Sequence, residues 1–238
     1  MKVILLNHTP HCIESAFVAA RTCYSGDFPE DIWKQVIPTS GENDRISDEK
    51  IYTLLDKIIA SGHHSVLEHI SFTFAIEGIS RACSHQLVRH RIASFSQQSQ
   101  RYVTLEPDSF VIPDTIKSDN QAKKLYDTFL NNSLKTYREL MELGIPKEDA
   151  RFVLPNAAKT NIVMTMNFRE LYNVCQIRLC TRAQWEIREL FWRVKMELSN
   201  IHSLKGLAGY LQPKCEVLGY CPEHRSCGKF PTREEMSK

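Results

Sequence analysis

Side chains able to bind an anionic ligand are concentrated in one stretch of the sequence. No Asp or Glu occurs between Glu77 and Glu106, a window of 28 residues, although the chain as a whole has 28 acids in 238 residues. A guanidinium is a planar, permanently charged donor that matches phosphate oxygens, and Ser and Gln side chains can bind hydroxyl and amide edges. The window therefore favours a phosphate-containing ligand, with a solvated basic face or a nucleic-acid-binding surface as alternatives. Its chemically active residues are Arg81, His85, Gln86, Arg89, His90, Arg91, Ser94, Ser96, Gln97, Gln98, Ser99, Gln100 and Arg101.

A helix is predicted over residues 79–90, followed by a polar Ser/Gln-rich loop over 91–102. On a helix, Gln86, Arg89 and His90 stand at i, i+3 and i+4 and would share one face. That face ends where the polar loop begins. We therefore expect one ligand to contact both segments.

The rest of the chain predicts interleaved strands and helices. Residues 69–77 alternate between apolar and polar side chains, which is typical of a half-buried strand, and Gly78 is expected to end it. Further strands are predicted at 2–6 and 161–166, and helices at 50–60, 120–143, 146–153, 168–180 and 183–202, before an irregular tail from about residue 211. No long linker separates these elements, so we predict one α+β domain covering residues 1–238.

Composition narrows the class of protein. Hydrophobic residues make up 42% and charged residues 24%, which excludes a disordered chain, and a net charge of +2 argues against a globally basic nucleic-acid binder. Neither a membrane-spanning run nor a signal-peptide core is present, so we expect a cytoplasmic protein with reduced thiols. The C-terminal group Cys215, Cys221, His224 and Cys227 has metal-like content but not a standard zinc spacing, and free thiols are preferred.

One motif in the acid-free window is specific. Arg89-His90-Arg91, then seven residues, then Ser99 and Gln100-Arg101-Tyr102 resembles the signature of the flavin-dependent thymidylate synthases. Other segments are similar to that family in the expected order, over roughly residues 50–200. They are Gly62 to His69, Ala150 to Pro155, Asn167 to Arg178 and Ala183 to Glu186.

The resemblance implies an activity and an architecture. Enzymes of this family convert dUMP to dTMP with FAD, with NADPH as reductant and methylenetetrahydrofolate as carbon donor, and without a Cys nucleophile. The protein then mainly positions its ligands. The resemblance also implies a twisted antiparallel sheet flanked by helices, and a homotetramer with active sites at subunit interfaces. Nucleic acid, membranes and metal ions are not among the expected partners.

The resemblance further assigns roles to individual residues. Arg178, from a neighbouring subunit, would bind dUMP and polarise the uracil, and His63 matches a position linked to folate and hydride-step chemistry. The positions that match flavin contacts are Ser65, Glu68, Arg89, His90, Arg91, Ile92, Asn167, Arg169 and Asn173. The positions that match nucleotide contacts are Gln86, Arg89, Gln97, Gln98, Ser99, Gln100, Arg101, Arg151 and Arg178.

The spacing of the predicted flavin residues on the helix at 168–180 is compatible with their assignment. Arg169, Asn173 and Ile177 are four residues apart and would form one ridge along a helix, which suits a ring and its phosphates. Arg178 lies well around the helix from that ridge, so it can serve a different ligand.

Departures from the family pattern leave some roles open. Ser96 and Gln97 stand where some members have Asn and Glu, and Arg182 stands where some have His. Replacement of Glu by Gln removes a charge that would repel the dUMP phosphate.

Structural alternatives also remain for several residues. Ser65 with Glu68 is a capping-box pattern, and Asn167 is a helix-cap residue in sequence. Arg178 with Arg182 fits a solvated helix face, and Arg151 could pair with Glu148. As competing functions we weigh a nucleic-acid-binding module and a flavin reductase without methyl transfer.

Overall fold

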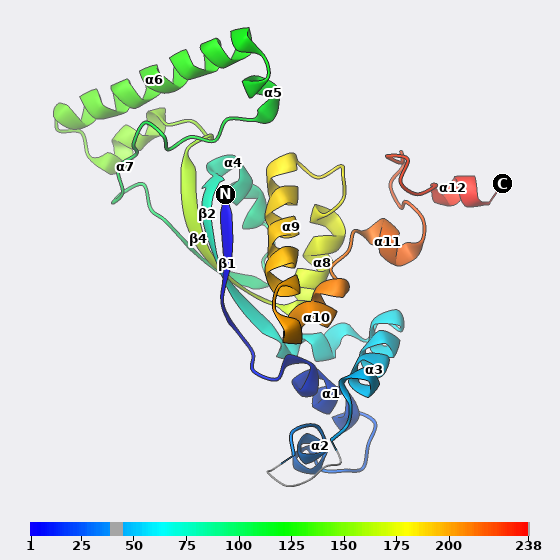
Figure 1. Ribbon diagram of the computed structural model, residues 1–238. Coiled ribbons are helices and arrows are strands. Elements are labelled where there is room, and N and C mark those ends of the chain that lie inside the picture. Colours follow the sequence, from blue (N-terminus) through cyan, green and yellow to red (C-terminus); the bar gives the residue numbers. More distant parts are fainter. Residues whose placement is uncertain (39–44, 238) are drawn as a thin grey trace. The chain divides into compact units, whose positions relative to one another are not determined.

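The fold is built on a four-stranded sheet within residues 1–38 and 45–237, which the computed structural model describes (Figure 1). The strands β1 (Lys2–His8), β2 (Ser71–Ser80), β3 (Ala93–Gln97) and β4 (Lys159–Asn167) lie in the order β1-β2-β4-β3. The two inner strands, β2 and β4, alternate between buried and accessible residues, as a sheet with one apolar face requires. Helices flank this antiparallel sheet, so the predicted α+β fold class is confirmed.

The described chain forms two compact units, and neither is a continuous segment. The boundary between them falls within β1, β2, β3 and β4, so residues of each strand belong to both units. Unit 1 contains Met1–Lys2, Ala75–Arg89 and Phe95–Val163, and unit 2 contains Val3–Phe74, His90–Ser94 and Met164–Lys238. The predicted extent of the domain, residues 1–238, stays a prediction.

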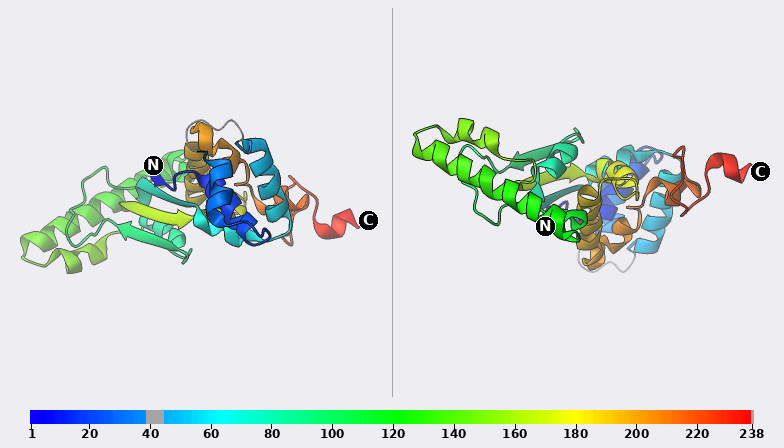
Figure 2. Two further views of the ribbon diagram at one scale, coloured as in Figure 1. Left: turned by 90° about the horizontal axis from the view of Figure 1, so that it is seen from below. Right: turned by 90° about the horizontal axis from the view of Figure 1, so that it is seen from above.

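Unit 1 has its own hydrophobic core around the long helix α6 (Asn120–Glu142). Leu130, Leu134 and Tyr137 on one side of α6 are buried together with Phe110 and Ala158. Three short elements pack against α6, namely helix α5 (Asp114–Lys117), helix α7 (Lys147–Ala150) and the 3-10 helix η2 (Arg151–Val153). Unit 1 also contains helix α4 (Arg81–Leu87). Both views in Figure 2 show α6 as the longest helix.

Unit 2 is mostly helical. Helix α1 (Cys12–Thr22) packs against α2 (Pro29–Val36), α3 (Asp48–Ala60) and the 3-10 helix η1 (His64–His69), while α8 (Phe168–Arg178) packs against η1 and α9 (Trp185–Ser199). The unit ends with η3 (His202–Leu204), α10 (Lys205–Gly209), α11 (Lys214–Leu218) and α12 (Arg233–Met236). The larger helices bury apolar stripes, in which Leu55 of α3, Leu171 of α8 and Leu190 of α9 are completely buried.

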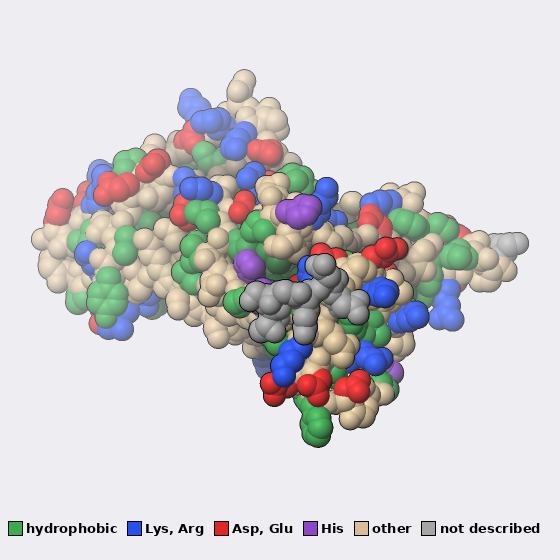
Figure 3. All heavy atoms as spheres, turned by 60° about the horizontal axis from the view of Figure 1, so that its bottom comes forward, with side chains coloured by type: hydrophobic (Ala, Val, Ile, Leu, Met, Phe, Trp, Pro, Cys, Tyr) green, Lys and Arg blue, Asp and Glu red, His purple; other side chains and the backbone are tan. Residues whose placement is uncertain are grey.

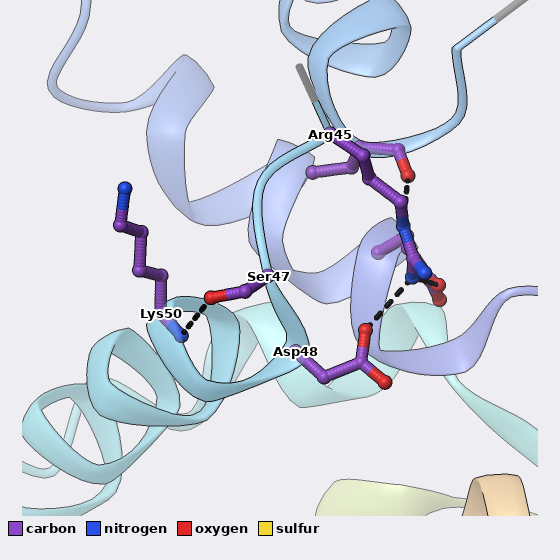
Figure 4. A network of polar contacts seen from close by, with 6 residues as sticks. Arg45, Ser47, Asp48 and Lys50 are labelled. Carbon is purple, nitrogen blue, oxygen red and sulfur yellow. Dashed lines mark hydrogen bonds and ion pairs between the residues drawn. The ribbon is translucent and has the colours of Figure 1, made fainter. Parts of the chain in front are cut away.

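A polar network connects three helices of unit 2 (Figure 4). Arg45 donates from Nε to the Val36 carbonyl at 2.9 Å and from Nη2 to Glu14 and Asp48 at 2.9 and 2.8 Å. The Glu14 side chain is only 10% exposed, so its buried negative charge is stabilised mainly by the Arg45 guanidinium. Ser47 caps α3 by accepting from the Lys50 amide.

Most predicted elements are present, and the differences have physical reasons. The strand predicted at 69–77 continues through Gly78, which adopts a φ of 70° and donates its N–H to the Asn161 side chain at 3.0 Å. Residues 93–97 form strand β3, where a loop is predicted. Its Ser and Gln side chains give no apolar alternation, and pairing with β4 decides its conformation.

The helix predicted over 79–90 is shorter, which corrects the argument built on it. Helix α4 ends at Leu87, with Val88 as its C-cap. Gln86, Arg89 and His90 therefore do not share a helix face. The structure also contains helices that the sequence does not predict, including α1, α2 and, in the tail, the short α11 and α12. None of the helices described in residues 1–38 and 45–237 is both long and apolar enough to cross a membrane.

Candidate functional site

The segment Arg89-His90-Arg91 presents its three side chains differently. Arg89 and Arg91 are exposed, and Ile92 beside them is 64% exposed, whereas the His90 side chain is only 11% exposed. The segment follows the C-cap of α4 and precedes β3, so it is a turn and not a helix. Two cations and an apolar side chain thus face outward, while the histidine between them faces the protein.

His90 contacts both ends of α8. Arg178, the last residue of α8, donates from Nε to His90 Nε2 at 3.0 Å, and Glu170 in the first turn lies 3.8 Å from His90 Nδ1. An arginine only donates, so His90 Nε2 must be an acceptor and the ring must be neutral, with its proton on Nδ1. Burial, reinforced by the Arg178 charge, lowers the pKa of His90 to about 4. Geometry and electrostatics therefore agree on a neutral ring.

Helix α8 carries the predicted ridge. Asn167 caps the helix by accepting from the Glu170 amide at 2.9 Å, as its sequence pattern indicates. Arg169 forms an ion pair with Glu68 of η1, so two predicted flavin residues 101 positions apart in sequence meet. Asn173 is exposed in the same helix, and Ile177 is 57% exposed. This ridge therefore offers charged, amide and apolar surface.

His63 and Ser65, which both have predicted roles, stand at the start of η1. Ser65 is not a helix cap, because η1 begins at His64 and its N-cap residue is His63, which makes no side-chain cap bond. The capping-box interpretation of Ser65 is therefore wrong. His63 Nδ1 lies 3.3 Å from the hydroxyl of Tyr24, and both residues are exposed.

The residues predicted to bind the nucleotide lie mainly in unit 1. Gln97 donates from Nε2 to Ser84 at 3.0 Å and to Thr160 at 3.3 Å, so its amide group is partly engaged inside the protein. Ser99 Oγ accepts from the Arg101 amide at 3.2 Å, which fixes the turn after β3. The remaining members of this set are Gln86, Arg89, Gln98, Gln100 and Arg151.

The Glu148 carboxylate pairs with a different arginine than the sequence suggested. The Arg151 Nε donates to the Glu148 backbone carbonyl at 3.0 Å, and the Glu148 carboxylate instead pairs with Arg101 Nε at 2.7 Å. The alternative in which the side chains of Arg151 and Glu148 form an ion pair is therefore wrong. The Glu148 carboxylate of α7 thus contacts Arg101 in the turn that follows β3, and Arg151 follows α7 directly in η2.

Arg81 belongs to the acid-free window but is not among the residues predicted to contact the nucleotide or the flavin. It donates from Nη2 to the Gln98 carbonyl at 2.9 Å, and its Nε is buried with no hydrogen-bond partner in the described residues. Burial and the nearby Arg151 charge both lower the pKa of Arg81. Two neighbouring cations of this kind suit an anion. The acid-free window contains Arg81, but only the fold places it beside Arg151.

A cavity of about 480 Å³ in unit 2 adjoins the end of α8. Arg178 and Arg182 are among its lining residues, and so are four cysteines, Cys180, Cys215, Cys221 and Cys227. His224 is not in that lining, and within the part of the chain that the structure describes no three His, Cys, Asp or Glu side chains are placed to hold a metal ion. The cysteines are free thiols.

Neither arginine of this helix end is simply solvated. Arg182 donates to the Arg225 carbonyl at 2.9 Å and lies 3.9 Å from Glu223, and Arg178 contacts His90. On the face shown in Figure 3, basic side chains are interspersed with acidic ones and form no continuous basic surface. This distribution gives no support to a nucleic-acid-binding face there.

Comparison of the sequence with known families agrees with the motif. The family described as "Thymidylate synthase complementing protein" matches residues 4–202. The flavin-dependent thymidylate synthase of Geobacter sulfurreducens is 45% identical over 96% of this chain and 94% of its own length. That of Pyrococcus furiosus is 41% identical over 94% of this chain and 90% of its own length. The chain belongs to the flavin-dependent thymidylate synthase family and is an enzyme of that class.

Solved structures show the same fold at lower identity. A UMP/dUMP methylase from Streptomyces cacaoi bound with 5-Br dUMP matches with a TM-score of 0.73 and 20% identity, over 90% of this chain and 96% of that one. A flavin-dependent thymidylate synthase from Helicobacter pylori complexed with FAD and dUMP matches with a TM-score of 0.60 and 24% identity, over 83% and 93%.

Proposed function

We propose that this enzyme methylates dUMP to dTMP, using FAD, with methylenetetrahydrofolate as carbon donor and NADPH as reductant. In the balanced reaction, the methylene carbon of the folate is transferred to C5 of the uracil, C5 loses its hydrogen as a proton, and a hydride that originates from NADPH reduces the methylene to a methyl group. In net terms a proton is consumed, and tetrahydrofolate and NADP⁺ are released. The observation that carries the proposal is the Arg89–Ser99 motif in a chain 45% identical, over nearly its full length, to a flavin-dependent thymidylate synthase.

The proposed flavin-binding residues fit the chemistry of that cofactor. When bound, FAD supplies hydride transfer between NADPH and the nucleotide. Arg91 and Arg169 offer charge for its phosphates, and the exposed side chains of Ile92 and Ile177 offer apolar surface for its ring. The other residues that we assign to this site are Ser65, Glu68, Arg89, His90, Asn167 and Asn173.

Unit 1 offers a fitting environment for the phosphate of dUMP. Arg81 and Arg151 are neighbouring cations, and the donors that the structure gives them contact neutral carbonyl oxygens. A dianionic phosphate would relieve their mutual repulsion. The other residues that we assign to the nucleotide site are Gln86, Arg89, Gln97, Gln98, Ser99, Gln100 and Arg101.

Arg178 and His63 carry the proposed direct roles in the reaction. A guanidinium at the uracil carbonyl stabilises the negative charge that develops when the ring is activated. The contact from Nε to His90 restrains the Arg178 guanidinium, and a restrained guanidinium suits such a role. We assign His63 to the folate and hydride step.

The chain's thiols are consistent with a reaction that needs no Cys nucleophile. Cys83 and Cys175 are fully buried, and burial raises the pKa of Cys12 to about 12. A buried thiol with a raised pKa is a weak nucleophile at neutral pH. Cys23, Cys180, Cys215 and Cys227 are more accessible, and a hydrogen bond with Thr181 lowers the pKa of Cys227. Because we assign no thiol to the reaction, we expect Cys→Ser substitutions at these four positions to leave dTMP formation largely intact.

Assembly and location complete the proposal. We propose a cytoplasmic homotetramer in which Arg178 serves the dUMP site of a neighbouring subunit. Support comes from membership of the flavin-dependent thymidylate synthase family, whose resemblance implies this assembly.

The test is dTMP formation by the purified, FAD-supplemented protein. The protein should show flavin absorbance, and dUMP should stimulate its NADPH oxidation. NADPH oxidation indifferent to dUMP would instead indicate a flavin reductase, and salt-dependent DNA or RNA binding without flavin would indicate a nucleic-acid-binding module. Absence of dTMP with all substrates present would refute the proposal.

The division of roles has its own test. Arg178→Ala should abolish most dUMP turnover while FAD retention is unchanged, because Arg178 contacts the nucleotide and not the flavin. Arg138→Ala on α6 is the matched control, since Arg138 makes an exposed contact with Glu106 and has no proposed role. Equal loss of FAD and dUMP binding would contradict the division.

A further inference from the structure

Glu170 makes a contact that the proposed chemistry does not yet use. It lies in the first turn of α8, and its side chain is only 12% exposed. Its Oε1 lies 3.8 Å from His90 Nδ1, and the Asn173 side chain also hydrogen-bonds to its carboxylate. A nearly buried carboxylate that faces a nearly buried imidazole is costly unless the two groups are placed to interact.

The direction of the hydrogen bonds follows from donor chemistry. Arg178 Nε donates to His90 Nε2 at 3.0 Å, which requires the His90 proton to be on Nδ1. Nδ1 in turn lies 3.8 Å from Glu170 Oε1, which is beyond hydrogen-bond length but close enough for electrostatic attraction. A carboxylate at this position favours the same tautomer, and the Phe191 ring, 6.2 Å away at 76°, restrains the imidazole further.

The arrangement joins the two ends of one helix through a residue of another segment. Glu170 and Arg178 stand at the first and last turns of α8, and His90 connects them. Because the guanidinium is planar, holding its Nε restricts the directions in which its two Nη groups can point. The orientation of Arg178 therefore depends on the tautomer of His90.

We propose that Glu170 is a positioning residue that holds His90 in the Nδ1-protonated tautomer, so that His90 Nε2 aligns the Arg178 guanidinium for the uracil of dUMP. The inference rests on the proposed function, because it assigns Arg178 to dUMP. The simpler alternative is that Glu170 only stabilises the first turn of α8, where an acidic side chain is favourable.

A double-mutant cycle on dUMP binding separates these two roles. dUMP affinity is measured by calorimetry on FAD-loaded wild type, Glu170→Ala, Arg178→Ala and the double variant. We expect Glu170→Ala to weaken dUMP binding about tenfold, which is the order expected if Arg178 loses one charge-assisted hydrogen bond to the uracil. FAD retention should be unchanged. In the Arg178→Ala background the same change should have almost no further effect.

Matched variants keep the test informative. Glu170→Gln retains an acceptor oxygen and should lose less dUMP affinity than Glu170→Ala, and it replaces the alanine variant in the cycle if that variant fails to fold. Glu30→Gln removes another first-turn acid, in α2, and should leave dUMP affinity unchanged. ¹⁵N shifts of the His90 ring should report a protonated Nδ1 in the wild type.

The outcomes distinguish this inference from the proposed function. Wild-type dUMP affinity in both Glu170 variants, equal losses in the two backgrounds, or an Nε2-protonated ring would overturn the positioning role while leaving the thymidylate synthase activity intact. Absence of dUMP binding in the wild type would instead refute the proposed function, and this inference with it.

Discussion

The buried, neutral state of His90 predicts a specific dependence of stability on pH. In the folded protein the pKa of His90 is lowered from 6.5 to about 4, so between these values the unfolded chain binds more protons than the folded one. Stability from this residue is therefore fully present above about pH 6.5 and is lost as the pH falls toward 4. For this shift, the loss between pH 7 and pH 5 is about 2 kcal/mol of unfolding free energy.

The assay is urea unfolding of wild type and His90→Gln at pH 7 and pH 5, at one protein concentration. Groups that titrate in both proteins largely cancel in the difference. Glu170 lies 3.8 Å from His90, and because burial raises its pKa its contribution acts in the opposite direction in both proteins. We expect the wild type to lose about 2 kcal/mol more than the variant on acidification.

The control is His85→Gln, because His85 is exposed and lacks the burial that produces the effect. It should follow the wild type at both pH values. If His90→Gln and wild type lose the same unfolding free energy between pH 7 and pH 5, the ring is not held neutral. The assignment of its hydrogen bonds would then be wrong.

Three further predictions concern stability and ligand retention. Arg45→Ala leaves the Glu14 carboxylate, 10% exposed, without its partner and should lower the unfolding free energy by about 1–3 kcal/mol in denaturant titrations. Arg45→Lys should recover part of this, and an unchanged midpoint for Arg45→Ala would contradict the network. Phe74→Ala removes a fully buried ring from β2 and should cost about 3–5 kcal/mol, whereas Phe152→Ala, at a ring 83% exposed, should cost less than about 0.5 kcal/mol. Similar losses for both would mean that Phe74 is not in the core. Asn167→Ser should keep the α8 cap that Asn167→Ala loses at about 1 kcal/mol. A fall in FAD retention for Asn167→Ser at wild-type stability would support a flavin contact, and unchanged retention would leave Asn167 as a cap alone.

Local signals in the sequence determine much of this protein. The alternation of Phe72, Phe74 and Ile76 predicts β2, and all three side chains are completely buried. The Asn167–Glu170 pattern predicts the start of α8, and the side-chain cap is present there. The motif from Arg89 to Ser99 identifies the family, because its residue types and spacing are local and need no knowledge of the fold.

Tertiary structure decided what these residues contact. Nothing local indicates that His90 turns inward between two exposed arginines to meet both ends of α8, or that Arg81 lies beside Arg151. Strand β3 does not follow from its sequence either, since pairing with β4 overrides a polar segment without apolar alternation. The sequence likewise does not indicate that α4 ends at Leu87. Spacing along the chain fixes which side chains share an element, but long-range packing alone brings together groups that are far apart in sequence.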